Sequence, residues 1–394
     1  MKSKKVIFLF FICPMLIAHH TIAHHTDDLH ISWSQAALLP DLSGVKQIGV
    51  AGPFAGLSNG VMLIAGGSNF PGAKPWNGGK KVHRREIYLL SKLHGAAFKC
   101  IALNQYLAEG TAYGASVTTS KGIVCLGGET DGANCSTKAF LMRWDAHKRI
   151  VVFDDLPPIP IAVANASAAA INGTVYLFGG ENKGMPVDKA FLLDLNNNHP
   201  KWKSIPPLPI TMSHSVAVTQ SNKHYPCIYV IGGRSATASG ISHLHGTTFC
   251  FDPVQQKWSR LSDISDGKKA TNLSAATAIA IGDDRIILIS GDKGDIFHKI
   301  ESYNAAINKA AAESEKKELQ AKKMELITHH PGFSQDVYLY NTVTDQWRKL
   351  HKLPFHGQVT TTAVKWGNNI LIPGGEIMPG TRTAAITLGL ISKS

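Results

Sequence analysis

The chain has 394 residues, of which 44% are hydrophobic and 17% are charged, so it can bury a sizeable core as a globular protein. Its formal net charge is +12, but the basic residues are scattered and form no block interleaved with aromatic residues. This distribution argues against nucleic-acid binding and fits a general field that attracts a small acidic substrate.

The first residues have the order of a secretory signal peptide. Three lysines precede an apolar run from Val6 to about Ala18, and small residues follow this run. We expect residues 1–23 to be the signal peptide, with cleavage after Ala23, or after Ala18 as the alternative. The apolar run is too short to span a membrane comfortably. The sequence therefore predicts an exported, periplasmic protein that covers residues 24–394 and is not held in a membrane.

An apolar run that ends in glycine recurs along the chain and divides it into similar units. Most of the units are about 50 to 60 residues long, and turn residues separate about four strand-like stretches in each. A second element, an aromatic or apolar residue before a Leu-Pro-like turn, lies between these runs, as in DQWRKLHKLPF. The six runs are VMLIAGG (61–67), GIVCLGG (122–128), TVYLFGG (174–180), CIYVIGG (227–233), RIILISG (285–291) and NILIPGG (369–375).

Repeats of this kind predict an all-β fold, a six-bladed β-propeller. A single four-stranded twisted sheet cannot bury both of its faces, whereas six such sheets stacked around an axis can. The paired motifs resemble the kelch repeat over about residues 30–394. The repeats begin with the element that contains Trp33 and end with TRTAAITLGLI, so we expect the first strand to complete the last blade.

The loop after the first glycine pair is the first candidate for part of a ligand site. It contains Asn69 and Phe70 in GGSNFPG and leads to the densest basic run, KKVHRR (80–85). Loops on one rim of a scaffold such as a propeller commonly build its binding site. A solvated surface loop is the alternative interpretation.

Five of the six cysteines follow the predicted signal peptide, and an odd number leaves at least one free thiol in an exported protein. Cys227 and Cys250 lie in neighbouring predicted strands and could pair, but buried free thiols are the interpretation we favour. The sequence contains no CxxC spacing, so it does not indicate a zinc site. His243 and His245 would share one face of a strand without a third ligand, so we expect surface histidines and no metal.

One unit, between Gly291 and Gly375, is longer than the others. Its additional stretch, residues 302–326, is rich in Ala, Glu and Lys, which are strong helix formers, and Ser302 can serve as its N-cap. We expect one helical insertion that rises from a loop of the ring. It is either a lid over the mouth of the channel or a solvated ornament, that is, an exposed insertion without a role in the site.

The last glycine pair is followed at once by a carboxylate. Glu376 comes after Gly375, and Pro379-Gly380 suits a type II turn that brings Arg382 back beside it. Both side chains can reach the central channel from such a hairpin. An exposed ion pair of little energetic value is the structural alternative.

Several of these stretches together resemble the N-acetylneuraminate epimerases, which are also called sialic acid mutarotases. The stretches are GGSNFPG, EGTAYGAS, CLGGET, GDIF and GGEIMPGTRT. The last of them contains every fixed position of the family's Gly-Glu-x-x-Pro-Gly-x-Arg-Thr motif. In this family the motif normally lies well inside the chain, whereas here it is close to the C-terminus. The chain therefore resembles a cyclically permuted form, which a closed ring tolerates because its ends are neighbours.

The resemblance implies a mutarotase that accelerates the interconversion of the α- and β-anomers of N-acetylneuraminate. Glu376 and Arg382 would be its catalytic pair, with Glu376 as the general base of ring opening and closing. The guanidinium fork of Arg382 suits bidentate pairing with the C1 carboxylate of the sugar, and Asn69 and Phe70 would also bind the substrate. Sialic acid is then the partner, no cofactor is expected, and the protein could form a homodimer.

Two other classes of protein share the predicted fold. A non-catalytic kelch propeller that binds carbohydrate or protein would not need a carboxylate–arginine pair at its channel. A sialidase would share the six-bladed plan and the ligand, but its typical S-x-D-x-G-x-x-W turns do not occur in this sequence. The sequence therefore favours the mutarotase and keeps the non-catalytic propeller as the alternative.

Overall fold

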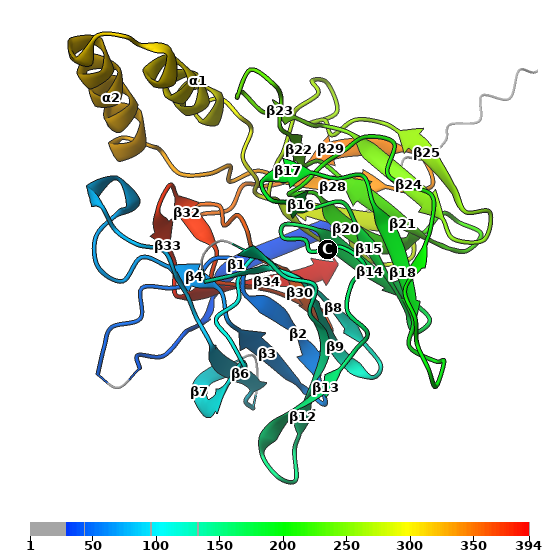
Figure 1. Ribbon diagram of the computed structural model, residues 1–394. Coiled ribbons are helices and arrows are strands. Elements are labelled where there is room, and N and C mark those ends of the chain that lie inside the picture. Colours follow the sequence, from blue (N-terminus) through cyan, green and yellow to red (C-terminus); the bar gives the residue numbers. More distant parts are fainter. Residues whose placement is uncertain (1–28, 43, 95–96, 132–133, 394) are drawn as a thin grey trace, which may run out of the picture.

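The computed structural model describes residues 29–42, 44–94, 97–131 and 134–393, which form a ring of β-sheets with two helices projecting from it (Figure 1). The predicted signal peptide lies outside the described residues. Within the described part of the chain, no helix is long and apolar enough to cross a membrane. The prediction of an all-β, six-bladed β-propeller with a helical insertion is confirmed.

The described residues form six four-stranded antiparallel sheets, the blades, and the first strand named for each blade lies nearest the central axis. Blade 1 contains β2 (Phe54–Ser58), β3 (Val61–Ala65), β6 (Glu86–Lys92) and β7 (Phe98–Tyr106). Blade 2 contains β8 (Ala115–Thr119), β9 (Gly122–Leu126), β12 (Ala139–Asp145) and β13 (Ile150–Asp155). Blade 3 contains β14 (Ser167–Ile171), β15 (Thr174–Phe178), β18 (Ala190–Asp194) and β19 (Lys203–Ser204).

The remaining three blades follow the same plan. Blade 4 contains β20 (Val216–Ser221), β21 (Pro226–Ile231), β24 (Thr248–Asp252) and β25 (Lys257–Leu261). Blade 5 contains β26 (Thr277–Ile281), β27 (Arg285–Ile289), β28 (Val337–Asn341) and β29 (Gln346–Lys349). Blade 6 contains β30 (Val364–Trp366), β31 (Asn369–Pro373), β34 (Ala385–Lys393) and β1 (Leu29–Leu38).

In five blades of the described chain, a short two-stranded ribbon follows the second strand. The ribbons are β4–β5 (Ser68–Asn69, Val82–His83), β10–β11 (Glu129–Thr130, Asn134–Cys135), β16–β17 (Glu181–Asn182, Met185–Pro186), β22–β23 (Arg234–Ser235, His243–Leu244) and β32–β33 (Glu376–Met378, Thr381–Arg382). In blade 5, helices α1 (Phe297–Lys309) and α2 (Glu313–Thr328) take the place of the ribbon. A 3-10 helix, η1 (Pro75–Asn77), lies in the loop of the first ribbon.

The glycine pairs turn the chain from the blade into the ribbon. At Gly374 and Gly375 the backbone angle φ is +61° and +96°, and a Cβ on Gly374 would lie 2.5 Å from the carbonyl oxygen of Val50. Glycine adopts this conformation and allows this close approach without strain. The residue after each glycine pair is thereby brought to one rim of the ring.

A ring of backbone hydrogen bonds surrounds the axis at this rim. Each of its members donates its N–H to the carbonyl oxygen of the corresponding residue in the preceding blade, over 2.7–3.2 Å, until the circle closes. All members have positive φ, a conformation that costs free energy in residues other than glycine and persists only where the surroundings enforce it. The members are Gly52, Tyr113, Asn165, His214, Ala275 and Thr360.

The hydrophobic core lies between the facing sides of neighbouring blades. Tyr229 of blade 4 and Tyr340 of blade 5, for example, belong to one buried cluster. Tryptophans in or directly before the outer strands link the blades as well. Nε1 of Trp202, Trp258 and Trp347 donates to a carbonyl oxygen in the segment after the preceding blade, over 2.8, 3.0 and 3.1 Å. The second element of the repeat therefore fastens each of these blades to its neighbour.

The ring closes where the two ends of the described chain meet. Strand β1 pairs with β34, with Leu29 opposite Lys393 at one end. The indole of Trp33 lies against Gly389, where a Cβ would approach the ring to 2.5 Å. The prediction that the first strand completes the last blade is confirmed.

The insertion differs from the single helix predicted for residues 302–326. It begins earlier, at Phe297, and consists of two helices separated by an extended break at Ala310. Ser302 is not the N-cap, because it lies inside α1, where its Oγ donates to the carbonyl oxygen of His298 over 2.7 Å. Helix propensity favours a continuous helix through the alanine-rich break, but the packing of α2 back onto α1 requires the chain to turn there.

The five described cysteines are free thiols. Cys227 and Cys250 lie on adjacent strands, but no disulfide joins them. Cys125 and Cys227 are buried and the other three are partly buried. These positions agree with the free-thiol interpretation of the sequence.

Candidate active site

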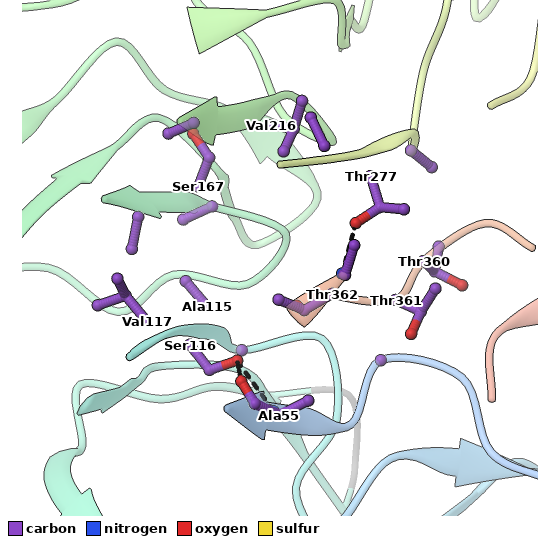
Figure 2. A pocket seen from close by; sticks show the side chains of 18 of the residues that line it. Ala55, Ala115, Ser116, Val117, Ser167, Val216, Thr277, Thr360, Thr361 and Thr362 are labelled. Carbon is purple, nitrogen blue, oxygen red and sulfur yellow. Dashed lines mark hydrogen bonds between the residues drawn. The ribbon is translucent and has the colours of Figure 1, made fainter. Parts of the chain in front are cut away.

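Two cavities lie along the propeller axis, and the ring of backbone hydrogen bonds contributes to the walls of both. The first, the axial channel, has a volume of about 330 Å³ and is lined by the innermost strands. Most of its lining side chains are small. In Figure 2, two of its hydroxyl groups bond to neighbouring blades, Ser116 to the backbone of Ala55 and Thr277 to the N–H of Ala363. The described residues that line it include no carboxylate. The axial channel therefore lacks an acidic side chain for chemistry.

The second cavity, which we call the cup, opens at the rim that carries the ribbons. Its volume is about 440 Å³, and its wall includes the residues that directly follow the glycine pairs of several blades. The helical insertion adds an apolar part of the wall with Phe297, Ile300 and Ile327. The ionisable residues in the described wall are Lys81, Tyr113, Glu129, Glu181, His214, Arg234, Asp292, His330 and Glu376.

The β32–β33 hairpin places Glu376 in the wall of the cup and pairs it with Arg382. Nη1 of Arg382 donates to Oε1 of Glu376 over 2.9 Å, and the N–H of Gly380 donates to the same oxygen over 2.6 Å. Gly380 has a φ of +65°, as the predicted Pro-Gly turn requires. Nζ of Lys74 holds the turn from outside by donating to Oγ1 of Thr381 over 2.7 Å. The two residues that the sequence places together are therefore in contact.

The environment of Glu376 changes its acidity. Burial raises the pKa of this carboxyl above its ordinary value, whereas the charge of Arg382 and the hydrogen bond from Gly380 act in the opposite direction. The positive charges of Lys81 and Arg234 also lower this pKa. A carboxyl group with a raised pKa at the edge of a cavity is suited to general acid–base chemistry.

Arg382 lies behind the wall of the cup. Its side chain is 6% exposed, its Nη2 donates to the hydroxyl of Tyr113 over 3.2 Å, and its guanidinium lies over the ring of Phe70 at 4.7 Å. The described residues that line the cup include Glu376 and Tyr113 but not Arg382. Arg382 therefore acts on the cup through these two residues.

Asn69 and Phe70, which the sequence suggests as substrate-binding residues, line a separate cavity behind the hairpin. This cavity has a volume of about 470 Å³ and includes Arg382 in its wall. Asn69 is buried, and its Nδ2 donates to the carbonyl oxygen of Gly49 over 2.9 Å. The structure brings both residues to the Arg382 side of the hairpin and not into the cup.

Blades 3 and 4 contribute a second polar group of residues, which we call the Arg234 network: Ser213, Glu181, His214 and Arg234. Nη2 of Arg234 donates to Nε2 of His214 over 3.2 Å. Because arginine can only donate, Nε2 of His214 is the acceptor, and its proton lies on Nδ1, which is 3.2 Å from Oε1 of Glu181. Oγ of Ser213 donates to the same carboxylate oxygen over 2.7 Å.

The charges within the Arg234 network follow from these contacts. Burial alone would raise the pKa of Glu181, but hydrogen bonds from His214 and Ser213 and the charge of Arg234 lower it to about 2. Burial and the nearby charge of Arg234 lower the pKa of His214, although Glu181 opposes this. At neutral pH the network therefore contains an ionised glutamate, a neutral histidine and a positive arginine.

Lys81 and Glu129 form a direct ion pair in the part of the wall that belongs to blades 1 and 2. Burial would raise the pKa of Glu129, but hydrogen bonds from His83 and Lys81 lower it. Lys81 also lies over the ring of Tyr113, at 5.1 Å from its centre. The charge of Lys81 is therefore paired with the Glu129 carboxylate of the protein itself.

The described residues contain no group of three or more His, Cys, Asp or Glu side chains that could hold a metal ion. His243 and His245 stack edge to face at 4.7 Å. His243 is exposed, as predicted, but the prediction of a surface position is wrong for His245, which is buried. The β22–β23 ribbon folds the His245 ring against Ser235, with Nε2 and Oγ 2.7 Å apart.

The sequence alone does not predict the Arg234 network, although one signal for it is present. Glu181 and Arg234 directly follow glycine pairs, in GGEN and GGRS, as Glu376 does in GGEI. This position leads into the cup in each of the three blades. His214 has no comparable signal, because the ring of backbone hydrogen bonds places it there.

These observations define a class of protein, the six-bladed β-propellers that hold a partly buried glutamate, backed by an arginine, in a cup at one end of the axis. The sequence profile of the family described as N-acetylneuraminate epimerase matches residues 11–151 and 156–394. The chain therefore belongs to the N-acetylneuraminate epimerase family.

Individual members of this family are distant relatives. The N-acetylneuraminate epimerase of Haemophilus influenzae (strain PittEE) is 26% identical over 229 residues, which are 58% of this chain and 57% of that protein. The one of Salmonella typhimurium is 26% identical over 233 residues, 59% of this chain and 57% of that protein. The N-acetylneuraminate epimerase of Vibrio cholerae is 38% identical over 115 residues, which are 27% of this chain and 28% of that protein. The chain thus covers less than two thirds of the length of these relatives.

Proposed function

We propose that this protein accelerates the interconversion of the α- and β-anomers of N-acetylneuraminate. The proposal rests on Glu376, which is held by Arg382 and Gly380, has a raised pKa and faces a cavity of about 440 Å³. A cavity of this size can hold a single sugar. Membership in the N-acetylneuraminate epimerase family supports the same substrate.

The proposed reaction requires only proton transfers and the breaking and forming of one C–O bond. Glu376 takes the proton of the anomeric hydroxyl, and the electrons of that O–H bond form the C2 carbonyl. The bond between C2 and the ring oxygen breaks, and the ring oxygen receives a proton from Glu376 in turn or from water. After rotation about the C2–C3 bond, the same steps in reverse close the ring on the other face of the carbonyl.

Arg382 supports this chemistry as a positioning residue. It orients the Glu376 carboxylate through one hydrogen bond, and its charge lowers the pKa that burial raises. Phe70 supports Arg382 in turn, because the guanidinium lies over its ring at 4.7 Å. Positioned acid–base groups contribute about 10²–10⁴-fold, which is sufficient for a reaction that also proceeds unaided.

Glu376→Gln tests the proposed function. The amide oxygen can keep the hydrogen bonds from Gly380 and Arg382, so the fold should remain intact, but the amide cannot take up the proton. We expect the enzymatic acceleration of anomer equilibration, followed by NMR, to fall by about 10²-fold or more. The same substitution at exposed Glu318 of α2 is the matched control and should keep full activity. Parent-like acceleration by Glu376→Gln would overturn the proposal.

A non-catalytic carbohydrate-binding propeller is the second candidate. The observation that favours it is the mixed wall of the cup, in which cations and the apolar side chains of Phe297, Ile300 and Ile327 could bind a sugar without any proton transfer. Thermal protection of the wild-type protein by N-acetylneuraminate, without acceleration of anomer equilibration, would favour this candidate.

The proposed site of action is the periplasm. This proposal rests on the order of charged, apolar and small residues within residues 1–23. Cell fractionation, followed by N-terminal sequencing of the mature protein, tests it. A cytoplasmic protein that keeps its first residues would contradict it.

A further inference from the structure

We propose that Arg234 binds the carboxylate of the substrate, so that the cup contains a carboxylate-binding subsite on a different wall from Glu376. The inference rests on the proposed function, because the group in question is the C1 carboxylate of N-acetylneuraminate. From the sequence, Arg382 is the expected partner of this group. The described structure favours Arg234 for four reasons.

The first reason is the charge that is available in the cup. Among the described residues, the arginine and lysine side chains that line it are Lys81 and Arg234. Lys81 is in direct contact with the carboxylate of Glu129. Arg234 lies 3.9 Å from the carboxylate of Glu181, which is longer than a hydrogen bond. Of these two cations, Arg234 is therefore the one more available to bind an anion.

The second reason is the number of free donors. The guanidinium of Arg234 bonds to His214 through Nη2, and the structure shows no other hydrogen bond from it to a described residue. Its side chain is 27% exposed, compared with 6% for Arg382. Both terminal nitrogens of Arg382 are already engaged. Two parallel N–H donors of one guanidinium match the two oxygens of a carboxylate, and Arg234 still has N–H donors that can bind them.

The third reason is that the fold holds Arg234 in place before any ligand binds. His214 fixes one edge of the guanidinium, and the ring of Phe297 from α1 covers one face at 5.0 Å. Helix α1 is fastened to the β22–β23 segment, because Glu301 accepts hydrogen bonds from the N–H and Oγ of Ser242 over 2.8 and 2.6 Å. An arginine that is already ordered loses less entropy when it binds a ligand.

The fourth reason is the chemistry of the sugar. The C1 carboxylate is bonded directly to C2, the carbon at which the two anomers differ. Binding of the carboxylate therefore also fixes the reacting carbon relative to Glu376, which is an effect of orientation. Arg234 and Glu376 line the same cavity, so one sugar can contact both.

A comparison of two ligands tests the subsite. N-acetylneuraminate and its uncharged C1 methyl ester are titrated into each variant by calorimetry, and the wild type should bind the acid at least about tenfold more tightly. Arg234→Gln should remove this preference by weakening the binding of the acid, with little effect on the ester. Arg234→Lys should keep part of the preference, because the charge remains but the fork is lost. Phe297→Leu should reduce the preference without any change at Arg234 itself.

Three further variants separate this inference from its competitors. Arg143→Gln, at an exposed ion pair with Asp154 in blade 2, is the matched control and should keep the preference. Arg382→Gln should accelerate anomer equilibration less at neutral pH but should also keep the preference. The inference is overturned if Arg234→Gln retains the preference, or if Lys81→Gln or Arg382→Gln loses it instead.

The outcomes also separate this inference from the proposed function. A wild-type protein that binds neither ligand and does not accelerate anomer equilibration contradicts the proposed function itself. A wild-type protein that accelerates the reaction, together with an Arg234→Gln variant of unchanged preference, contradicts the subsite alone. Thermal unfolding of each variant shows whether a loss of binding reflects a loss of fold.

Discussion

At the scale of single residues, Glu376 is subject to two opposing influences. Its burial in the wall of the cup stabilises the neutral carboxyl, whereas Arg382 and the N–H of Gly380 stabilise the carboxylate. The raised pKa shows that burial is the larger of the two. The proton affinity of this group therefore depends on a partner that does not itself line the cup.

The pH profile of the reaction should report this dependence. The base must be ionised, so the acceleration should fall as the pH decreases through the raised pKa of Glu376. Arg382→Gln removes a charge that lowers this pKa, so the acid limb should move to higher pH. We expect Arg382→Lys to keep the limb close to its wild-type position because the charge remains. The rate of anomer equilibration, measured by NMR over a pH series and corrected for the unaided reaction, gives both midpoints.

A purely structural role of Arg382 would give a different result. It would lower the acceleration at every pH and leave the midpoint of the acid limb in place. Arg143→Gln, which removes an arginine far from the hairpin, should change neither quantity.

The local part of the candidate site could be predicted from the sequence, and the part that depends on long-range packing could not. Glu376 and Arg382 are joined by a short Pro-Gly turn, so their spacing alone indicates that they meet. Arg234 and His214 meet because their segments pair across a blade, and Phe297 reaches Arg234 from a helix more than 60 residues further along the chain. The glycine pair before Arg234 indicates its place at the rim, but no local spacing indicates that it meets His214 and Phe297.

At the scale of elements, the helical insertion contributes to the cup more than to the core. Neither α1 nor α2 contains a buried residue. Phe297, Ile300 and Ile327 nevertheless line the cup. Of the two roles suggested by the sequence, this position supports a cover over the cup more than a solvated ornament.

Replacement of residues 297–328 by a short turn, like that of the β16–β17 ribbon, tests this role. The melting temperature should change little, because no buried side chain is removed. The catalytic efficiency toward N-acetylneuraminate should fall by about tenfold or more, because Arg234 loses its contact with Phe297, and a partly buried cation–π contact contributes about 1–2 kcal/mol. Calorimetric melting and NMR kinetics measure the two effects.

A milder change in the same element is the control. Substitution of the exposed pair Glu318 and Lys322 by glutamine leaves the wall of the cup intact and should leave the efficiency unchanged. Full activity after removal of the whole insertion would show that the helices are an ornament.

The elements also show where sequence patterns are reliable. The blades could be predicted because apolar runs, glycine pairs and tryptophans recur with a regular spacing. The insertion has no repeat to compare with, and its helix-forming composition continues through the break at Ala310. Its division into two helices therefore depends on tertiary packing that composition does not encode.

At the scale of the whole molecule, the ring is closed by hydrogen bonds between β1 and β34, and no disulfide among the described cysteines joins the two strands. The absence of a side chain at Gly389 makes space for the indole of Trp33. This contact lies in the middle of the pairing between the two strands, so it should stabilise the closed ring.

Gly389→Val should therefore destabilise the protein. A Cβ at this position would approach Trp33 to 2.5 Å, and overpacking of this kind typically costs about 1–3 kcal/mol. We expect the melting temperature to fall by a few degrees. Gly72→Val is the control, because a Cβ on Gly72 meets no atom within 4 Å. An unchanged melting temperature of Gly389→Val would show that Trp33 does not secure the closure.

The closure has a consequence for the folding of the protein. Among the described strands, β1 pairs with β34, which lies more than 340 residues further along the chain. Until the two strands meet during folding, β1 presents an unpaired strand edge, the kind of surface to which other chains adhere. Because contacts between segments so far apart in sequence form slowly, we expect the joining of β1 to β34 to be a late step of folding.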